Sequence, residues 1–365
     1  MNNITVRLAS TLFIISVCVF GIYFFSEIIV PLLLAFLLAI LLQPVVTFFQ
    51  NKTYLSHTLS VIITLLMALC IGGMIIMFIS TEIAGFSNDL PQIKEHLNTH
   101  FHHIQSWIYD NFRLSYSKQN RYLINLSEQS IDTGKELMKS TLTGFSSVLL
   151  MAILIPIYIL LILLYKNLFL NFLYKLIPNQ HHLILKDILL EIKTVVHSYI
   201  VGLLVEMLII ATLVSVSLMV IGVNYAVFIG VLTAILNLIP YAGIFSSALL
   251  TMGISLGNTT DLGVLISIAI LFTVVHLIDG NILLPKVVSS KVKINALVSM
   301  LGIILGGTLI GISGMFLALP VIAIIKVIFD RIPALQPWGY LLGDDIPLSP
   351  RKRRQKNQQK PSTNS

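Results

Sequence analysis

Two acidic residues lie in stretches of the chain that are otherwise apolar and long enough to cross a membrane. Asp279 follows His276 near the end of the run Leu262–Leu284, and Glu206 lies well inside Ser198–Ile221. Ionisable side chains are costly at membrane depth, so both carboxylates are candidates for function. His276 and Asp279 are three residues apart and share a helix face, which predicts a relay for protons or cations. The alternatives are an aspartate paired with nearby lysines and, for Glu206, a structural hydrogen bond to a neighbouring helix.

The stretch Asn237-Leu238-Ile239-Pro240-Tyr241-Ala242-Gly243 interrupts the apolar run Tyr225–Leu256. Pro240 has no amide hydrogen to donate, and its ring clashes with the preceding helical turn. A proline and a glycine together predict a broken helix, whose freed backbone groups need neighbouring protein or water as partners. Many transporters build a substrate site in this way. Asn237 and Tyr241 either line a polar pathway or cap the broken helix ends.

Glycines are concentrated in the last apolar run, Ile294–Ile328. Gly302/Gly306 and Gly307/Gly311 have the small-xxx-small spacing that allows close helix approach. Tight packing and backbone flexibility for gating are both consistent with this pattern. Together with the motifs above, the candidates for a transport pathway are Asp279, Glu206, Asn237, Pro240, Tyr241, Gly243, His276, Asn281, Gly306, Gly307 and Gly311.

The composition is that of an integral membrane protein. Of 365 residues, 56% are hydrophobic and 11% charged, whereas soluble domains are about 25% charged. Much of the net charge of +7 lies in Arg351–Arg354 and the residues that follow. We interpret this cluster as a positive-inside tail rather than a nucleic-acid-binding segment. The first apolar run has no small-x-small cleavage site, which favours an uncleaved membrane span.

These elements predict an all-α polytopic membrane protein with about eight transmembrane segments, of which the C-terminal ones are broken or re-entrant. Segments 1–3 occupy residues 1–79, and segments 4–8 occupy 146–330 with a cytoplasmic amphipathic linker at 166–197. Residues 80–145 form an extramembrane, periplasmic-side helical insertion. We expect two helices, the first starting near Asp89–Pro91, with a break between them around Leu114–Asn120. Its histidines, His96, His100 and His103, suit a surface better than a metal site. Residues 331–365 form a cytoplasmic basic tail, largely disordered.

The distribution of lysines and arginines between the loops supports the broken helices. With a cytoplasmic N-terminus, single crossings of Tyr225–Leu256 and Ile294–Ile328 would place Lys286, Lys291, Lys293 and the basic tail outside, against the positive-inside rule. Turns near Pro240 and near Gly311–Gly314 keep them inside. Each half of the first run has about 16 residues, roughly 24 Å, short of a hydrocarbon core about 30 Å thick. If each run instead contained two short or tilted full spans, the chain would return to the same side of the membrane.

Sequence motifs of enzymes are missing. The sequence has no nucleotide-binding glycine loop, no Ser/His/Asp arrangement and no zinc-hydrolase motif. The two cysteines, Cys18 and Cys70, lie in apolar runs and suggest neither a disulfide framework nor a metal site. We therefore expect no enzymatic activity, no metal and no cofactor.

Four blocks of the C-terminal half resemble the autoinducer-2 exporter family of permeases. The blocks are Tyr199–Gly202, Leu236–Gly243, Asp279–Lys286 and Gly306–Pro320, and their order and spacing match as well. The resemblance implies about eight membrane segments, a bacterial inner-membrane location, transport activity and self-association into a homo-oligomer. Some similar proteins export a quorum-sensing signal, and others are implicated in sodium or lithium/proton antiport. The chain departs from the family pattern at Val201, at Ile244 and at Asn295-Ala296.

Two functions follow from these observations. The first is a secondary transporter or exporter of a small solute or signal molecule, coupled to protons or Na⁺ through Asp279. The second is a non-transporting membrane scaffold that recruits envelope partners through residues 80–145. The expected partners are the lipid bilayer, a small-molecule or ion substrate and further copies of the chain, but no nucleic acid. Convergence of Asp279, Glu206 and Asn237 in space would favour the transporter.

Overall fold

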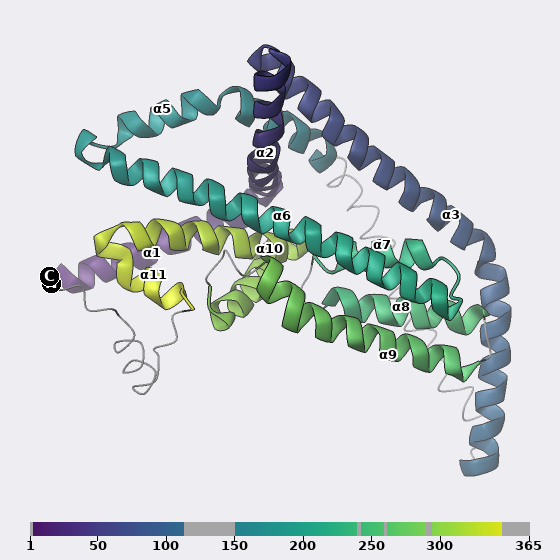
Figure 1. The fold of residues 1–365 in the computed structure, drawn as a ribbon. Helices are drawn as coiled ribbons and strands as arrows, with labels where there is room; N and C mark the ends of the chain where they lie inside the picture. Colours follow the sequence, from purple (N-terminus) through teal and green to yellow (C-terminus); the bar gives the residue numbers. More distant parts are fainter. Residues whose placement is uncertain (1–2, 113–149, 239–241, 259–260, 289–293, 345–365) are drawn as a thin grey trace, which may run out of the picture.

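The computed structural model describes residues 3–112, 150–238, 242–258, 261–288 and 294–344. These residues are almost entirely helical (Figure 1), which confirms the all-α class. In the described segments, five helices are long and apolar enough to cross a membrane, or six if a bent pair counts as one span. The protein is therefore a multi-spanning membrane protein. The number of eight segments stays a prediction.

Three helices form the N-terminal part: α1 (Asn3–Phe24), α2 (Ser26–Thr53) and α3 (His57–Phe112). Helix α3 is the longest in the described chain and changes direction along its length (Figure 1). The prediction of a new helix near Asp89–Pro91 is wrong, because α3 continues through both residues. A proline removes one hydrogen bond of a helix and can bend it without ending it. The predicted break around Leu114–Asn120 lies outside the described residues.

The middle of the chain bends sharply at Tyr165. A helix over Leu150–Leu164 is followed by α5 (Lys166–Leu176), and the two are bent by 63°. A short turn, η1 (Asn179–His181), then leads into α6 (His182–Ile221). The second half of the predicted polar linker is thus continuous with the predicted fifth span. Helix α6 has 40 residues, or roughly 60 Å at 1.5 Å per residue, and therefore extends beyond a bilayer core.

The apolar run after α6 is broken where the sequence predicts it. Helix α7 (Ala226–Leu236) ends before Pro240, and α8 (Ala242–Asn258) begins after it. The two helices pack against each other, and α7 also packs along α6. At 11 residues, α7 is only about 16 Å long. The chain thus breaks inside this run, as expected from Pro240 and Gly243.

The last part of the chain contains a second reversal. Helix α9 (Leu262–Ile278) passes into a π-helical turn, η2 (Asp279–Val288), and α10 (Ala296–Arg331) follows. The backbone is not helical at Ile310 and Gly311, and Gly311 has φ +65°. Gly306 packs directly against the backbone of Gly314, so α10 consists of two arms that lie side by side. The predicted hairpin near Gly311–Gly314 is present.

The two ends of this hairpin meet. The Asn295 amide group donates a 2.7 Å hydrogen bond to the carbonyl of Leu341, and its backbone N–H donates one of 3.1 Å to that of Leu342. Leu342 ends α11 (Gln336–Leu342), which follows η3 (Pro333–Leu335). Arg331, at the end of the second arm, also pairs with Asp187 and Glu191 near the start of α6. The beginning and the end of α10 therefore lie on the same side of the molecule.

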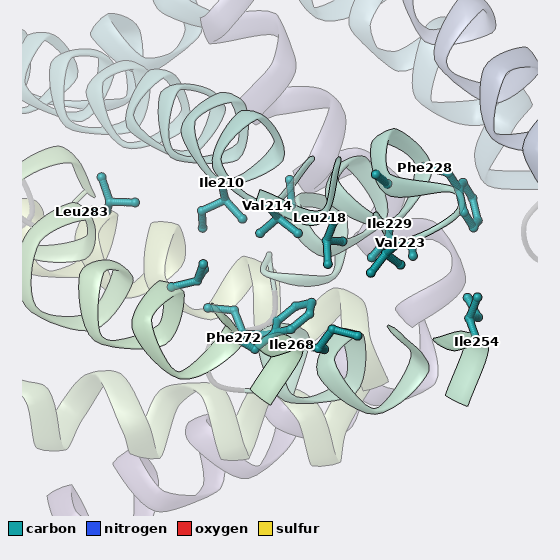
Figure 2. Packing of buried hydrophobic residues seen from close by; sticks show 14 residues of the cluster. Ile210, Val214, Leu218, Val223, Phe228, Ile229, Ile254, Ile268, Phe272 and Leu283 are labelled. Carbon is teal, nitrogen blue, oxygen red and sulfur yellow. The ribbon is translucent and has the colours of Figure 1, made fainter. Parts of the chain in front are cut away.

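A buried apolar cluster joins α6, α7, α8 and α9 (Figure 2). Its members on α6 recur every fourth residue, at Ile210, Val214 and Leu218, which is the spacing of one helix face. Ile268, Phe272 and Val275 of α9 form the facing stripe. This cluster fixes the relative positions of the helices that carry the polar residues described next.

Candidate functional site

The side chains of Glu206, Asn237 and Asp279 meet inside the protein. The Asn237 Nδ2 donates hydrogen bonds to Glu206 Oε1 at 3.1 Å and to Asp279 Oδ2 at 3.4 Å. The three residues are only 4%, 9% and 5% exposed. Three positions that are far apart in the sequence therefore form one buried polar cluster, rather than facing lipid or lying in separate cores.

Each residue of this cluster continues a buried helix stripe. Glu206 lies four residues before Ile210 on α6, and Asp279 lies four residues after Val275 at the end of α9. Asn237 directly follows the last residue of α7, four residues after the buried Thr233. Periodicity of three and four residues carries the same helix face onward. The polar cluster is therefore held in place by the apolar contacts of Figure 2.

The electrostatics of the cluster are unbalanced. Two carboxylates share a single amide group, and Glu206 Oε2, Asn237 Oδ1 and Asp279 Oδ1 are buried without a hydrogen-bond partner among the described residues. An unpartnered buried polar atom costs roughly 1–3 kcal/mol, and more if it is charged. Two neighbouring carboxylates in apolar surroundings cannot both stay ionised without a compensating positive charge. The arrangement therefore suits the uptake of a proton or a small cation.

Gly243 sets the distance between α7 and α8 beside this cluster. A Cβ atom at this position would collide with the carbonyl of Leu236 and the backbone nitrogen of Asn237. The close approach of the two backbones thus requires glycine and fixes the end of α7, from which Asn237 projects. Pro240 and Tyr241 lie outside the described residues.

Two other predicted residues lie off the site. His276 is exposed, because it follows the buried Val275 by one residue and is therefore about 100° away around the helix. Asn281 is also exposed, and its amide group donates to the carbonyl of Leu277 in its own helix at 2.9 Å. His276 is therefore exposed whereas Asp279 is buried, and the relay between these two residues stays a prediction.

The predicted glycines lie in the α10 hairpin. Gly306 packs against the other arm at Gly314, Gly307 faces Met315, and Gly311 forms the bend. The hairpin contacts α6 around Tyr199, through Leu317 and Ile310. Tyr199 lies about two helical turns, roughly 10 Å, before Glu206. The glycines therefore shape a neighbouring packing surface rather than the polar cluster.

Sequence reasoning missed a row of buried hydroxyl groups on α8. Ser247, Thr251 and Ser255 recur every fourth residue, and each is at most 3% exposed. The hydroxyl oxygens of Ser247 and Ser255 have no hydrogen-bond partner among the described residues. The signal was present as a Ser/Thr/Ser repeat with helical spacing in an apolar segment. It was hidden because small hydroxyl residues are common in membrane helices.

The ligand chemistry of the cluster is that of oxygen atoms alone. Within the described segments, no group of three or more His, Cys, Asp and Glu side chains could hold a metal ion. Carboxylate and amide oxygens suit hard cations. The side chains of His96, His100 and His103 lie outside the described residues.

Comparison with known proteins places the chain in a family. The model of the AI-2E transporter family matches residues 12–334. YueF of Bacillus subtilis (strain 168), provisionally named a transport protein, is 26% identical over 323 residues, which cover 86% of each chain. YhhT of Escherichia coli (strain K12), also provisionally named a transport protein, is 24% identical over 95% of this chain and 96% of its own. The AI-2 transport protein TqsA of the same strain is 23% identical over 94% of this chain and 97% of its own. The match to the family model covers most of the chain, and the protein belongs to the AI-2E family of membrane transporters.

Proposed function

We propose that the protein is a secondary transporter that moves a small solute or signal molecule and couples this movement to protons or Na⁺. Family membership supports membrane transport. Coupling rests on the pair of buried carboxylates, Glu206 and Asp279, joined by the amide of Asn237. We further propose an inner-membrane location, cytoplasmic termini and a homo-oligomeric assembly, as the positive-inside pattern and the family resemblance imply.

The observation that carries this proposal is the set of cluster oxygens that have no hydrogen-bond partner in the described part of the chain. Glu206 Oε2, Asn237 Oδ1 and Asp279 Oδ1 belong to one cluster, and all three are buried. A bound proton would turn one carboxylate into a donor, and a bound Na⁺ would take several of these oxygens as ligands. Either ion lowers the negative charge of the buried cluster. A site that takes up an ion and can release it again is what ion-coupled transport requires.

Loading and release need the cluster to reach water on each side in turn. Breaks in α7–α8 and α10 provide short helices that can move relative to the long helix α6. Discontinuous helices of this kind commonly surround transporter sites. Glu206 sits on the long helix and Asn237 on a short one. A shift of α7 against α6 would therefore open the cluster and weaken its hold on the ion.

Solute flux from proteoliposomes tests the proposal. Candidate solutes, including autoinducer-2, are loaded with an imposed pH or Na⁺ gradient, and efflux is compared between the unmodified protein, Glu206→Gln and Asp279→Asn. We expect each variant to lose gradient-driven flux at least tenfold, because one of the two charges is removed. Solute flux that both variants retain in full would remove the cluster from the mechanism.

Matched controls separate charge from folding. Glu27 is exposed, and Asp330 pairs with Lys326 near the end of α10. Glu27→Gln and Asp330→Asn make the same chemical changes outside the cluster and should keep the flux. If the unmodified protein moved none of the solutes under either gradient, the transport proposal itself would fail.

A further inference from the structure

A second polar feature lies away from the carboxylate cluster, in a pocket where the helix over Leu150–Leu164 bends into α5. The pocket has a volume of about 390 Å³ and lies between α2, the bent pair and the first part of α6. Three of its lining residues are lysines, Lys166, Lys186 and Lys193, and no acidic residue lines it. Most of the other lining side chains are apolar, including Phe36, Ile40, Leu163, Leu170, Leu189 and Leu190.

The positive charge of this pocket is not neutralised from within the described chain. Asp187 and Glu191 lie beside the lysines in the sequence, but both pair with Arg331 of α10, at 2.7 and 3.3 Å. Lys186 and Lys193 are seven residues apart and share the opposite stripe of α6 with Leu189 and Leu190. In the described segments, none of the three pocket lysines forms an ion pair.

Two of these lysines, Lys166 and Lys193, lie close enough for their charges to interact. Lys166 is half-buried, and the charge of Lys193 acts on it unfavourably. Like charges held together in a partly apolar pocket are destabilising unless an anion joins them. A pocket that is cationic at one end and apolar along its walls is complementary to an anion that carries a hydrocarbon chain.

The position of the pocket points to a membrane lipid. Phe36, Ala39, Ile40 and Gln43 belong to the middle part of the candidate span α2. Lys166 lies two residues after the end of the apolar helix over Leu150–Leu164, where the chain turns by 63°. Lysines at the ends of membrane helices lie at the level of the headgroups. The chain's own basic tail, Arg351–Arg354, is excluded as an occupant by its charge.

We propose that this lysine pocket binds an acidic phospholipid, with the phosphate between Lys166, Lys186 and Lys193 and an acyl chain along α2 and α6. Basic pockets between membrane helices are known to take such headgroups. The bound lipid would join α2 to the first part of α6, which lies about four turns or more before Glu206. This proposal is independent of the transported solute and of the coupling ion.

Lipid binding to the full-length protein tests this inference. The protein is purified in detergent, and binding of phosphatidylglycerol and of phosphatidylcholine is measured by native mass spectrometry. We expect the variant Lys166→Gln/Lys186→Gln/Lys193→Gln to bind phosphatidylglycerol at least tenfold more weakly, with unchanged binding of phosphatidylcholine. The control Lys52→Gln/Lys175→Gln/Lys356→Gln removes the same charge elsewhere and should bind as the unmodified protein does.

Further binding measurements distinguish between the possible occupants of the pocket. Inorganic phosphate or glycerol phosphate that displaced the lipid at equal concentration would identify a site for free anions and overturn the proposal. Equal loss of binding in the pocket and control variants would show general attraction to the charged protein, which also contradicts it. If the triple variant did not fold, Lys193→Gln alone should weaken binding of phosphatidylglycerol several-fold. Lys193→Arg, which keeps the positive charge, should bind as the unmodified protein does. Unchanged binding in Lys193→Gln would contradict the proposal.

Discussion

Asn237 is the neutral residue of the cluster formed with Glu206 and Asp279, and its amide group links the two carboxylates. Its amide group donates to both Glu206 and Asp279. Without this donor, two buried acidic groups would face each other with further unpartnered oxygens. Asn237 thus contributes to the stability of the cluster by donating to both buried carboxylates.

Replacing Asn237 tests this role. Asn237→Ala should lower the free energy of unfolding by about 2 kcal/mol, because both carboxylates lose a buried hydrogen bond. Thermal unfolding in detergent measures the change. Asn281→Ala serves as the control, since Asn281 is exposed and its amide group donates to the carbonyl of Leu277, four residues earlier. Its effect should stay within about 0.5 kcal/mol. Equal effects of the two variants would contradict a special role for Asn237.

The residue types of the site were predictable from the sequence, but their meeting was not. Glu206 and Asp279 stand out as acids in apolar runs, and Asn237 stands out beside Pro240. The hydrogen bonds that join them span 31 and 42 residues and depend on how two breaks orient the chain. His276 shows the limit of spacing arguments, because the buried face of α9 passes through Val275 and not through its neighbour.

At the scale of elements, two backbone reversals shape the C-terminal half. The α7–α8 break needs Gly243, where the backbones approach too closely for a side chain. The α10 hairpin bends at Gly311 in a conformation that only glycine adopts readily. The positive-inside distribution of lysines and arginines predicted both reversals. The uninterrupted course of α3 through Pro91 was not predicted, because local helix-start signals do not reveal a helix that has already begun.

Gly243→Ala tests the first reversal. The added methyl group collides with the backbone at Leu236 and Asn237, which cannot yield as a flexible side chain would. We expect a loss of about 3 kcal/mol in unfolding free energy, in the range of severe packing changes. Gly253 in the same helix α8 has open space around its Cα. Gly253→Ala should leave stability unchanged or raise it by up to about 1 kcal/mol, and a similar loss in both variants would contradict the close approach.

Cysteine labelling tests the second reversal. In a background with Cys18→Ser and Cys70→Ser, single cysteines replace Ala296 and Leu341, which are both exposed and lie near the two ends of the hairpin. A membrane-impermeant maleimide should reach both from the same side of oriented vesicles, because Asn295 bonds to Leu341 and Leu342. Labelling from opposite sides would show that the apolar run crosses once.

At the scale of the whole molecule, the long helix α6 connects the features described above. Its first turns pair with Arg331 and line the lysine pocket, its middle contacts the α10 hairpin, and Glu206 follows about two turns later. The continuity of the polar linker with this span could not be read from composition, which changes from charged to apolar near Ser198.

The central claim is that Glu206 and Asp279 take up and release a cation. Proton movement measured with a pH-sensitive dye inside proteoliposomes, under an imposed Na⁺ or solute gradient, tests it most directly. We predict that the unmodified protein acidifies or alkalinises the interior in response to the gradient, and that Glu206→Gln/Asp279→Asn reduces this response at least tenfold while Glu27→Gln/Asp330→Asn preserves it. A response of equal size in the protein without the two buried carboxylates would contradict the account.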